Sequence, residues 1–188
     1  MGEKGDRRKE EIKEQARILF AANGFNAVTM KDICEATGLS RGGLYRHYGS
    51  TAQIFKEMFK GMSDEGVESM YAAMERNIPA PTILEQALCM MQKQMMDAED
   101  SLSQAIYEYS NTVDSGFMIE MNKDAVRQWS TFIQYGIDRG EFCKVPVLQI
   151  VDMILYAYQG VRMWSRVMPL DQSIVEHYAD HFKMVLLG

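Results

Sequence analysis

The sequence predicts an all-α fold of about nine helices, with an N-terminal three-helix domain followed by a larger C-terminal helical domain. Apolar residues recur at the three- and four-residue spacing of helices almost everywhere, and no stretch shows the two-residue alternation of a strand. Only 4 of the 188 residues are proline, which leaves room for long helices. With 47% hydrophobic and 24% charged residues, the composition excludes disordered and collagen-like chains.

Charge divides the chain into two parts. The net charge of −6 and the pI near 5.1 by themselves oppose a nucleic-acid partner, because phosphate binding needs a basic surface. Residues 1–60, however, hold 11 basic and 8 acidic residues, whereas residues 61–188 hold 9 and 18. We therefore expect a domain over residues 1–50 that meets an anion and a separate domain over residues 51–188.

The first two helices have clear end signals. The first covers residues 7–23 and ends at Gly24, which accepts a left-handed conformation. Its apolar face consists of Ile12, Ala16, Leu19 and Phe20. Thr29 and Asp32 then form a capping box that opens a second helix, which reaches about residue 36.

A glycine turn joins the second helix to a short third one. Gly38 tolerates positive φ, and Ser40 is a good N-cap for a helix that continues to about residue 47. Two short helices around such a turn form a helix-turn-helix. The expected buried contacts are Ile33, Cys34, Leu39 and Leu44. The residues expected to face outward are Arg41, Gly42, Gly43, Tyr45, Arg46 and His47.

The rest of the chain predicts six longer helices. Ser50 and Gln53 form another capping box, which opens a helix over residues 50–76 that would join the two domains. The remaining predicted helices cover residues 82–97, 101–112, 118–139, 147–167 and 171–187.

Around the glycine turn, the sequence resembles a known family. Residues 24–25, 28–33 and 36–48 read GF, VTMKDI and ATGLSRGGLYRHY, similar to the signature of tetracycline-repressor (TetR) family transcriptional regulators. The resemblance implies an all-α homodimer with an N-terminal DNA-binding domain. It also implies a variable C-terminal domain that binds a small molecule and thereby releases DNA.

The third helix is the expected recognition helix in the major groove. Arg41 at its start can reach guanine or a phosphate, and the two glycines that follow allow the backbone close to DNA. Thr29 lies at a helix N-terminus, which suits a phosphate. The predicted DNA contacts are Thr29, Ser40, Arg41, Gly42, Gly43, Tyr45, Arg46, His47, Tyr48 and Thr51. Thr51 stands where family members usually carry lysine, so we expect a salt dependence weaker by about one unit of slope.

The C-terminal domain is rich in methionine, with 14 of the 16 methionines at residue 58 or beyond. Flexible, polarisable side chains suit a pocket for varied apolar ligands, although the same pattern also suits ordinary core packing. The predicted ligand contacts are Met91, Met95, Tyr107, Met121, Trp129 and Tyr158.

The last two helices are the expected dimer contact, since they would form a four-helix bundle with a second copy. The predicted interface residues are Tyr156, Gln159, Met163, Val175, Tyr178 and Phe182. The same spacing is also compatible with packing of this face against the protein's own core.

His177 and His181 have the i, i+4 spacing that can hold zinc, but Tyr178 follows His177 and there is no HExxH motif. A solvated or interface pair is therefore the favoured interpretation, and no metal or cofactor is predicted. The widely spaced Cys34, Cys89 and Cys143 contain no CxxC pair and are expected to be small buried hydrophobic residues in a reducing cytoplasm.

The sequence thus predicts a cytoplasmic, ligand-responsive regulator, most simply a repressor released from a palindromic double-stranded DNA operator by a small, largely apolar molecule. No GxSxG, P-loop or GxGxxG motif points to an enzyme, and no segment indicates a membrane partner. The alternative is a helical small-molecule-binding or catalytic module with a vestigial helix-turn-helix.

Overall fold

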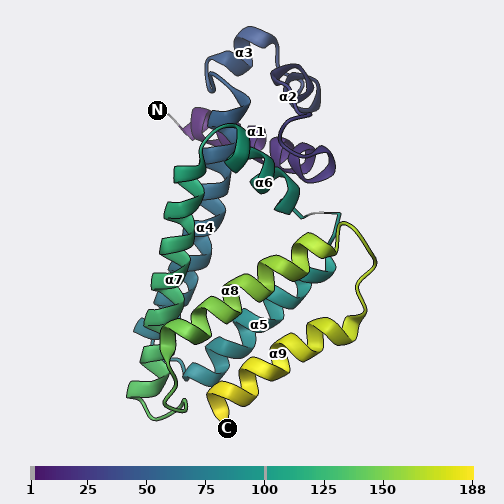
Figure 1. The fold of residues 1–188 in the computed structure, drawn as a ribbon. Coiled ribbons are helices and arrows are strands. Elements are labelled where there is room, and N and C mark those ends of the chain that lie inside the picture. The colour runs from purple at the N-terminus through teal and green to yellow at the C-terminus, as the bar shows by residue number, and fades with distance from the viewer. Residues whose placement is uncertain (1–2, 100) are drawn as a thin grey trace. The chain divides into compact units, whose positions relative to one another are not determined.

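The computed structural model describes residues 3–99 and 101–188, and these residues form helices without any strand (Figure 1). The all-helical prediction is confirmed. The helices are α1 (Glu3–Asn23), α2 (Met30–Thr37), α3 (Arg41–Tyr45), α4 (Thr51–Glu75), α5 (Ala80–Met96), α6 (Ser103–Thr112), α7 (Ser115–Asp138), α8 (Val147–Trp164) and α9 (Gln172–Leu187). Within the described ranges, no helix is long and apolar enough to cross a membrane.

Helix ends follow the local signals closely. Gly38 ends α2 with φ of 65°, and its N–H contacts the carbonyls of Cys34 and Glu35. At the start of α4, Ser50 accepts a hydrogen bond from the Gln53 N–H, while the Gln53 side chain accepts one from the N–H of Gly49. The capping box at α4 therefore forms with its return bond displaced by one residue.

Several helices differ in length from their predicted ranges. α1 begins at Glu3 rather than residue 7, α6 at Ser103 rather than residue 101, and α7 at Ser115 rather than residue 118. α5 begins at Ala80, because Pro81 fits the first turn of a helix rather than preceding it. α3 ends at Tyr45 instead of residue 47, and α8 ends at Trp164 instead of residue 167. In both cases the chain continues as a tighter turn, with i→i+3 bonds to the carbonyls of Leu44 and Trp164.

The chain packs into two compact units. Unit 1 comprises Met1–Ser63 and Leu102–Met118, and unit 2 comprises Asp64–Ser101 and Ile119–Gly188. The predicted boundary after residue 50 thus falls inside unit 1, because unit 1 also takes in the first half of α4 and, from much later in the chain, α6. α4 and α7 each begin in unit 1 and end in unit 2.

A cluster of aromatic rings forms the centre of unit 1. Phe20 of α1, Phe25 of the following turn and Phe55 of α4 contact one another with ring centroids 5.2–5.6 Å apart. Tyr109 of α6 stacks on Phe55 at 4.7 Å and meets Phe25 edge-on. Ring contacts of this kind hold α1, the turn before α2, α4 and α6 together.

The core of unit 2 is formed by α5, α7, α8 and α9. Its fully buried residues include Leu88 of α5, Phe132 of α7 and Val151 of α8. Gly136 leaves room for the Phe142 ring, since a Cβ at this glycine would lie 2.3 Å from that ring. Cys34 is buried as predicted, but the prediction is wrong for Cys89 and Cys143, which are both exposed, because neither takes part in this core.

Candidate nucleic-acid interface

The helix-turn-helix of unit 1 is held by the predicted caps. The Thr29 N–H donates to Asp32 Oδ2 at 2.8 Å, and the Asp32 N–H donates to the Thr29 hydroxyl at 3.3 Å. Ser40 accepts a bond from the Gly43 N–H at 3.1 Å and so starts α3. Ile33 and Leu44 are fully buried and Cys34 is buried, whereas Leu39 is half-buried. The turn therefore holds α3 firmly against α2.

The outward surface of α3 and its C-cap carries two arginines and an exposed glycine. Arg41, Gly42 and Arg46 are exposed, and Tyr45 is 49% exposed. A Cβ at Gly42 would have nothing within 4 Å, so the backbone there is open to a close approach from outside. This surface can donate hydrogen bonds to base edges or phosphates.

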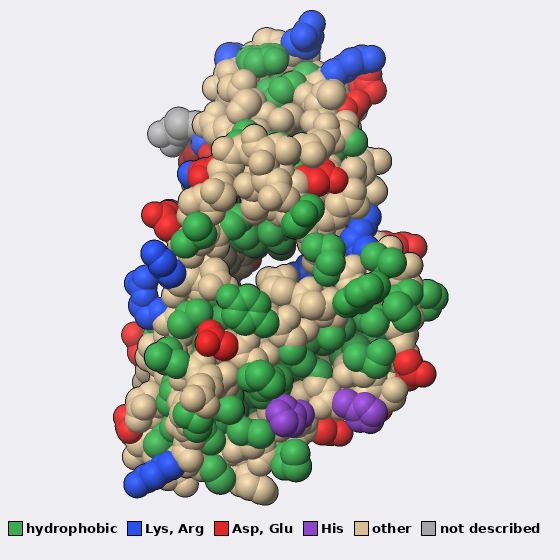
Figure 2. All heavy atoms as spheres, in the orientation of Figure 1, with side chains coloured by type: hydrophobic (Ala, Val, Ile, Leu, Met, Phe, Trp, Pro, Cys, Tyr) green, Lys and Arg blue, Asp and Glu red, His purple; other side chains and the backbone are tan. Residues whose placement is uncertain are grey.

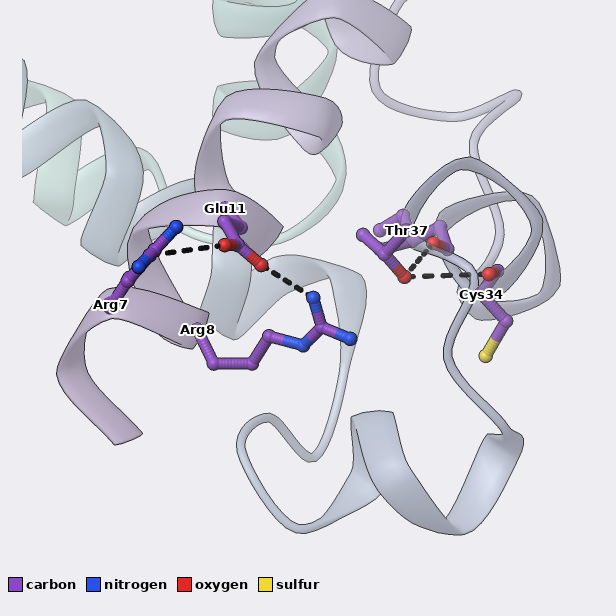
Figure 3. A network of polar contacts seen from close by, with 6 residues as sticks. Arg7, Arg8, Glu11, Cys34 and Thr37 are labelled. Carbon is purple, nitrogen blue, oxygen red and sulfur yellow. Dashed lines mark hydrogen bonds and ion pairs between the residues drawn. The ribbon is translucent and has the colours of Figure 1, made fainter. Parts of the chain in front are cut away.

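The other basic side chains of residues 1–60 are largely paired with acids. Arg7 and Arg8 both point at Glu11 (Figure 3), Lys9 binds Glu57 at 3.0 Å, and Lys56 binds Asp114 at 3.0 Å. Further ion pairs are Lys13–Glu10, Arg17–Glu14 and Lys31–Glu35. Among the Lys and Arg side chains of this segment that the structure describes, only Arg41, Arg46 and Lys60 make no ion pair.

Tyr48 does not belong to the exposed surface. It is 1% exposed, and the ammonium of Lys9 lies 5.1 Å from its ring centroid. Burial and the nearby Glu57 carboxylate raise the pKa of its hydroxyl. The burial of Tyr48 argues against its predicted DNA contact, because the chain turns after α3 and directs this ring between α1 and α4.

Gly43 is also buried, contrary to its predicted outward position, since a Cβ there would lie 3.3 Å from the Ser40 hydroxyl. The Thr29 and Ser40 hydroxyls are exposed but already serve as helix caps. His47 and Thr51 are half-buried. The side chains that unit 1 offers most freely to DNA are therefore Arg41, Tyr45 and Arg46.

Hydrogen bonding to the Thr29 side chain and N–H lowers the pKa of Asp32, so its carboxylate is ionised at the start of α2. A phosphate that approaches this helix N-terminus would meet a negative charge there. Thr29 therefore stays a predicted DNA contact only because it is exposed, since its hydroxyl already serves as the cap of α2.

The predicted ligand residues fall into separate places. Met91, Met95 and Trp129 are buried in the unit 2 core, and Tyr158 packs against it. Tyr107, in contrast, is 63% exposed on α6 in unit 1, and Met121 on α7 is half-buried outside that core cluster. The structure brings together four of the six residues.

The predicted dimer residues on α8 and α9 also divide. Tyr156, Gln159 and Met163 are exposed, whereas Val175, Tyr178 and Phe182 are buried. For the three α9 residues the structure favours the alternative of packing against the protein's own core. The Tyr178 hydroxyl, for example, donates to the carbonyl of Ile154 at 3.1 Å.

A different side of α9 is exposed together with α8. Figure 2 shows hydrophobic side chains gathered over these helices with histidine side chains beside them. We call this surface the α8/α9 face; its exposed residues are Met153, Tyr156, Gly160, Met163, Trp164, Ile174, His177, His181 and Met184. Sequence reasoning interpreted the two histidines as a solvated or interface pair but missed Ile174 and Met184, although these have helical spacing with the histidines.

The comparisons with known proteins agree on the family. The family described as bacterial regulatory proteins, tetR family, matches residues 12–58. The HTH-type transcriptional regulator YfiR of Bacillus subtilis is 30% identical over 187 residues, which cover 96% of this chain and 91% of that protein. The HTH-type transcriptional repressor KstR2 of Rhodococcus jostii is 28% identical over 72% of this chain and 68% of its own. A TetR transcriptional regulator from Chloroflexus aurantiacus, 22% identical, has the same fold over 100% of both chains, with a TM-score of 0.77.

Proposed function

This chain belongs to the TetR family of bacterial transcriptional regulators, and from that premise we propose that it is a homodimeric repressor of a palindromic operator, released by a small, largely apolar effector. Regulators of this family bind operator DNA, usually as dimers. KstR2, which matches over most of its length, carries the name of a repressor. We place the apolar effector in unit 2, where the predicted ligand residues Met91, Met95 and Trp129 are buried in the core and Tyr158 packs against it.

The observation that carries the DNA-binding part is the pairing of charges in unit 1. Seven basic side chains there are bound to acids, while Arg41 and Arg46 of the recognition segment are exposed and, within the described residues, unpaired. An exposed guanidinium without a counter-ion is ready to bind guanine or phosphate at little desolvation cost. A vestigial helix-turn-helix gives no reason for this selective exposure.

The α8/α9 face supports the dimer. Its apolar side chains include Tyr156 at 68% exposure and Trp164 at 59%, and Gly160 between them lets another helix approach closely. A contiguous exposed apolar face of this kind is typical of a protein interface. Two copies joined there would present two recognition helices to half-sites about one helical turn, ~34–36 Å, apart.

Effector release requires a connection between effector and operator sites, and we propose α4 and α6 for that role. Within unit 1, the Asn26 N–H donates to the Glu108 carboxylate of α6 at 2.8 Å. Gly24 has a φ of 79° and lies against the same carboxylate, since a Cβ at this glycine would be 2.7 Å from it. Lys56 of α4 binds Asp114, which follows α6. A shift of α6 would therefore move the turn that precedes α2. An effector that favours the shifted state lowers operator affinity by its difference in affinity for the two states.

The test is a polarisation titration and footprint of the full chain on the DNA beside its own gene. We expect a palindromic footprint with two half-sites, and loss of binding when an effector found by thermal shift is added. A single unpaired half-site would contradict the dimeric repressor. An effector that raises the melting temperature but leaves operator affinity unchanged would contradict the coupling.

A further inference from the structure

The outward side of α9 carries a histidine pair that the proposed function does not use. His177 and His181 are both exposed and lie one turn apart, with the exposed Ile174 before them and Met184 after them. Residues at i and i+4 project from the same helix face, about 5–6 Å apart at Cβ. The two imidazoles therefore lie side by side near the middle of the exposed side of α9.

Both imidazoles are available as ligands. Within the described residues neither ring makes a hydrogen bond or an ion pair, although His181 contacts the Phe182 ring at 5.3 Å. Of the nearby acids, Glu176 accepts a hydrogen bond from Gln172, and Asp171 accepts one from the Ser173 N–H as the N-cap of α9. Asp171 also lies near enough to His177 for an electrostatic interaction, but no hydrogen bond or ion pair within the described residues occupies a nitrogen of either ring.

We propose that His177 and His181 bind a divalent transition-metal ion such as zinc, and that the same pair of a second copy completes its coordination. Neutral imidazole is a preferred ligand of zinc, and a closed zinc site takes four ligands. In the described part of one chain, no group of three or more His, Cys, Asp or Glu side chains could hold a metal, so one copy supplies two ligands only. In a two-fold dimer the middle of a self-complementary surface meets its own copy, which doubles the pair to four.

This inference rests on the dimer of the proposed function. Its consequence is that the metal ion ties the two copies together, so metal concentration would raise the amount of dimer and with it the affinity for a two-half-site operator.

The experiment measures zinc binding and self-association of the full chain in the Cys89→Ser/Cys143→Ser background, so that the exposed thiols do not bind the ion. Calorimetric titration with zinc chloride should give one ion per two chains. His177→Ala and His181→Ala should each weaken binding by at least about tenfold, since even residues that only support metal ligands cost that much. The matched control is His177→Ala/Asp180→His, which keeps the number of histidines but places them at adjacent positions; it should also lose binding.

Sedimentation in EDTA and in zinc separates this inference from the dimer itself. A chain that is dimeric in EDTA and binds no zinc would overturn the metal site and leave the proposed dimer standing. One ion per chain, or equal binding by the adjacent-histidine control, would overturn the shared site. A chain that is monomeric in both solutions would overturn the proposed dimer. Zinc-dependent dimerisation lost in both single variants, with their helical content and melting temperature in EDTA unchanged, supports the proposal.

Discussion

The α3 surface and the α8/α9 face are both exposed, but they expose opposite chemistry. At α3, Arg41 and Arg46 make no ion pair within the described residues, whereas most other cations of residues 1–60 are paired with acids. The buried residues of this helix are Gly43 and Leu44. On the α8/α9 face the exposed residues are methionines, aromatic residues and histidines. The first surface suits an anion and the second suits another apolar surface, so solvent exposure alone does not define a site.

The largest contrast is expected between the two sides of the α8/α9 pair. Phe182→Ala should lower the unfolding free energy by about 3–5 kcal/mol, because the ring is 2% exposed in the unit 2 core. Tyr156→Glu should change the stability of the single chain by no more than about 0.5 kcal/mol yet dissociate the dimer, since it puts a charge on the apolar face. Denaturant unfolding at low protein concentration and sedimentation velocity measure the two effects. A stable dimer of the Tyr156→Glu variant would show that this face is not the interface.

The next contrast lies within unit 1. Arg41→Ala should weaken operator binding by about 1–3 kcal/mol, roughly 5- to 150-fold, because it removes an unpaired base- or phosphate-binding side chain. Arg7→Ala is the control, since it removes the same charge from a side chain already paired with Glu11. Fluorescence polarisation with operator DNA measures both. Equal losses would mean that net charge, rather than the α3 surface, determines binding.

A smaller effect is expected at the start of α4. Thr51→Lys should restore the cation common in the family and make the slope of log affinity against log salt steeper by about one, because one more counterion is released from DNA. Titrations from low to moderate salt measure this slope. An unchanged slope would place residue 51, which is half-buried here, away from the phosphates.

The smallest effect concerns the cap of α2. Hydrogen bonds from Thr29 lower the pKa of Asp32 below that of an unfolded aspartate, so the carboxylate stabilises the fold above about pH 4, and this stabilisation is lost as the pH falls through the lowered folded value. Asp32→Asn should therefore reduce stability at neutral pH and flatten its decline in acid. Urea unfolding at a series of pH values tests this; a variant whose stability falls as steeply as that of the wild type would argue against the cap.

Local chemistry accounts for what could be predicted best. The Thr29–Asp32 capping box, the left-handed Gly38 and the Ser40 N-cap are all present, because each involves residues within four positions of one another. The helix-turn-helix that these caps delimit could therefore be predicted as well. Arg41 and Arg46 could be identified as candidate DNA contacts because the caps fix where the third helix begins.

The errors concern helices that could have packed in more than one way. Tyr45 and Tyr48 are three residues apart with the same chemistry, and only the packing of α1 against α4, with Lys9 over the ring, buries the second. α9 carries two apolar stripes, and its contact with α5 and α8 decides that Val175 and Phe182 face inward.

By itself, then, the sequence determined the helical fold, the helix-turn-helix and its exposed arginines, since periodicity and caps act over a few residues. Only the tertiary structure decided that α6, distant in sequence, joins unit 1 through Glu108 and Tyr109, and that the histidine side of α9 faces outward. Such choices depend on which of several similar apolar surfaces fit together best. The free-energy difference between the alternative packings depends on contacts among several helices, so it cannot be derived from the sequence of any single helix.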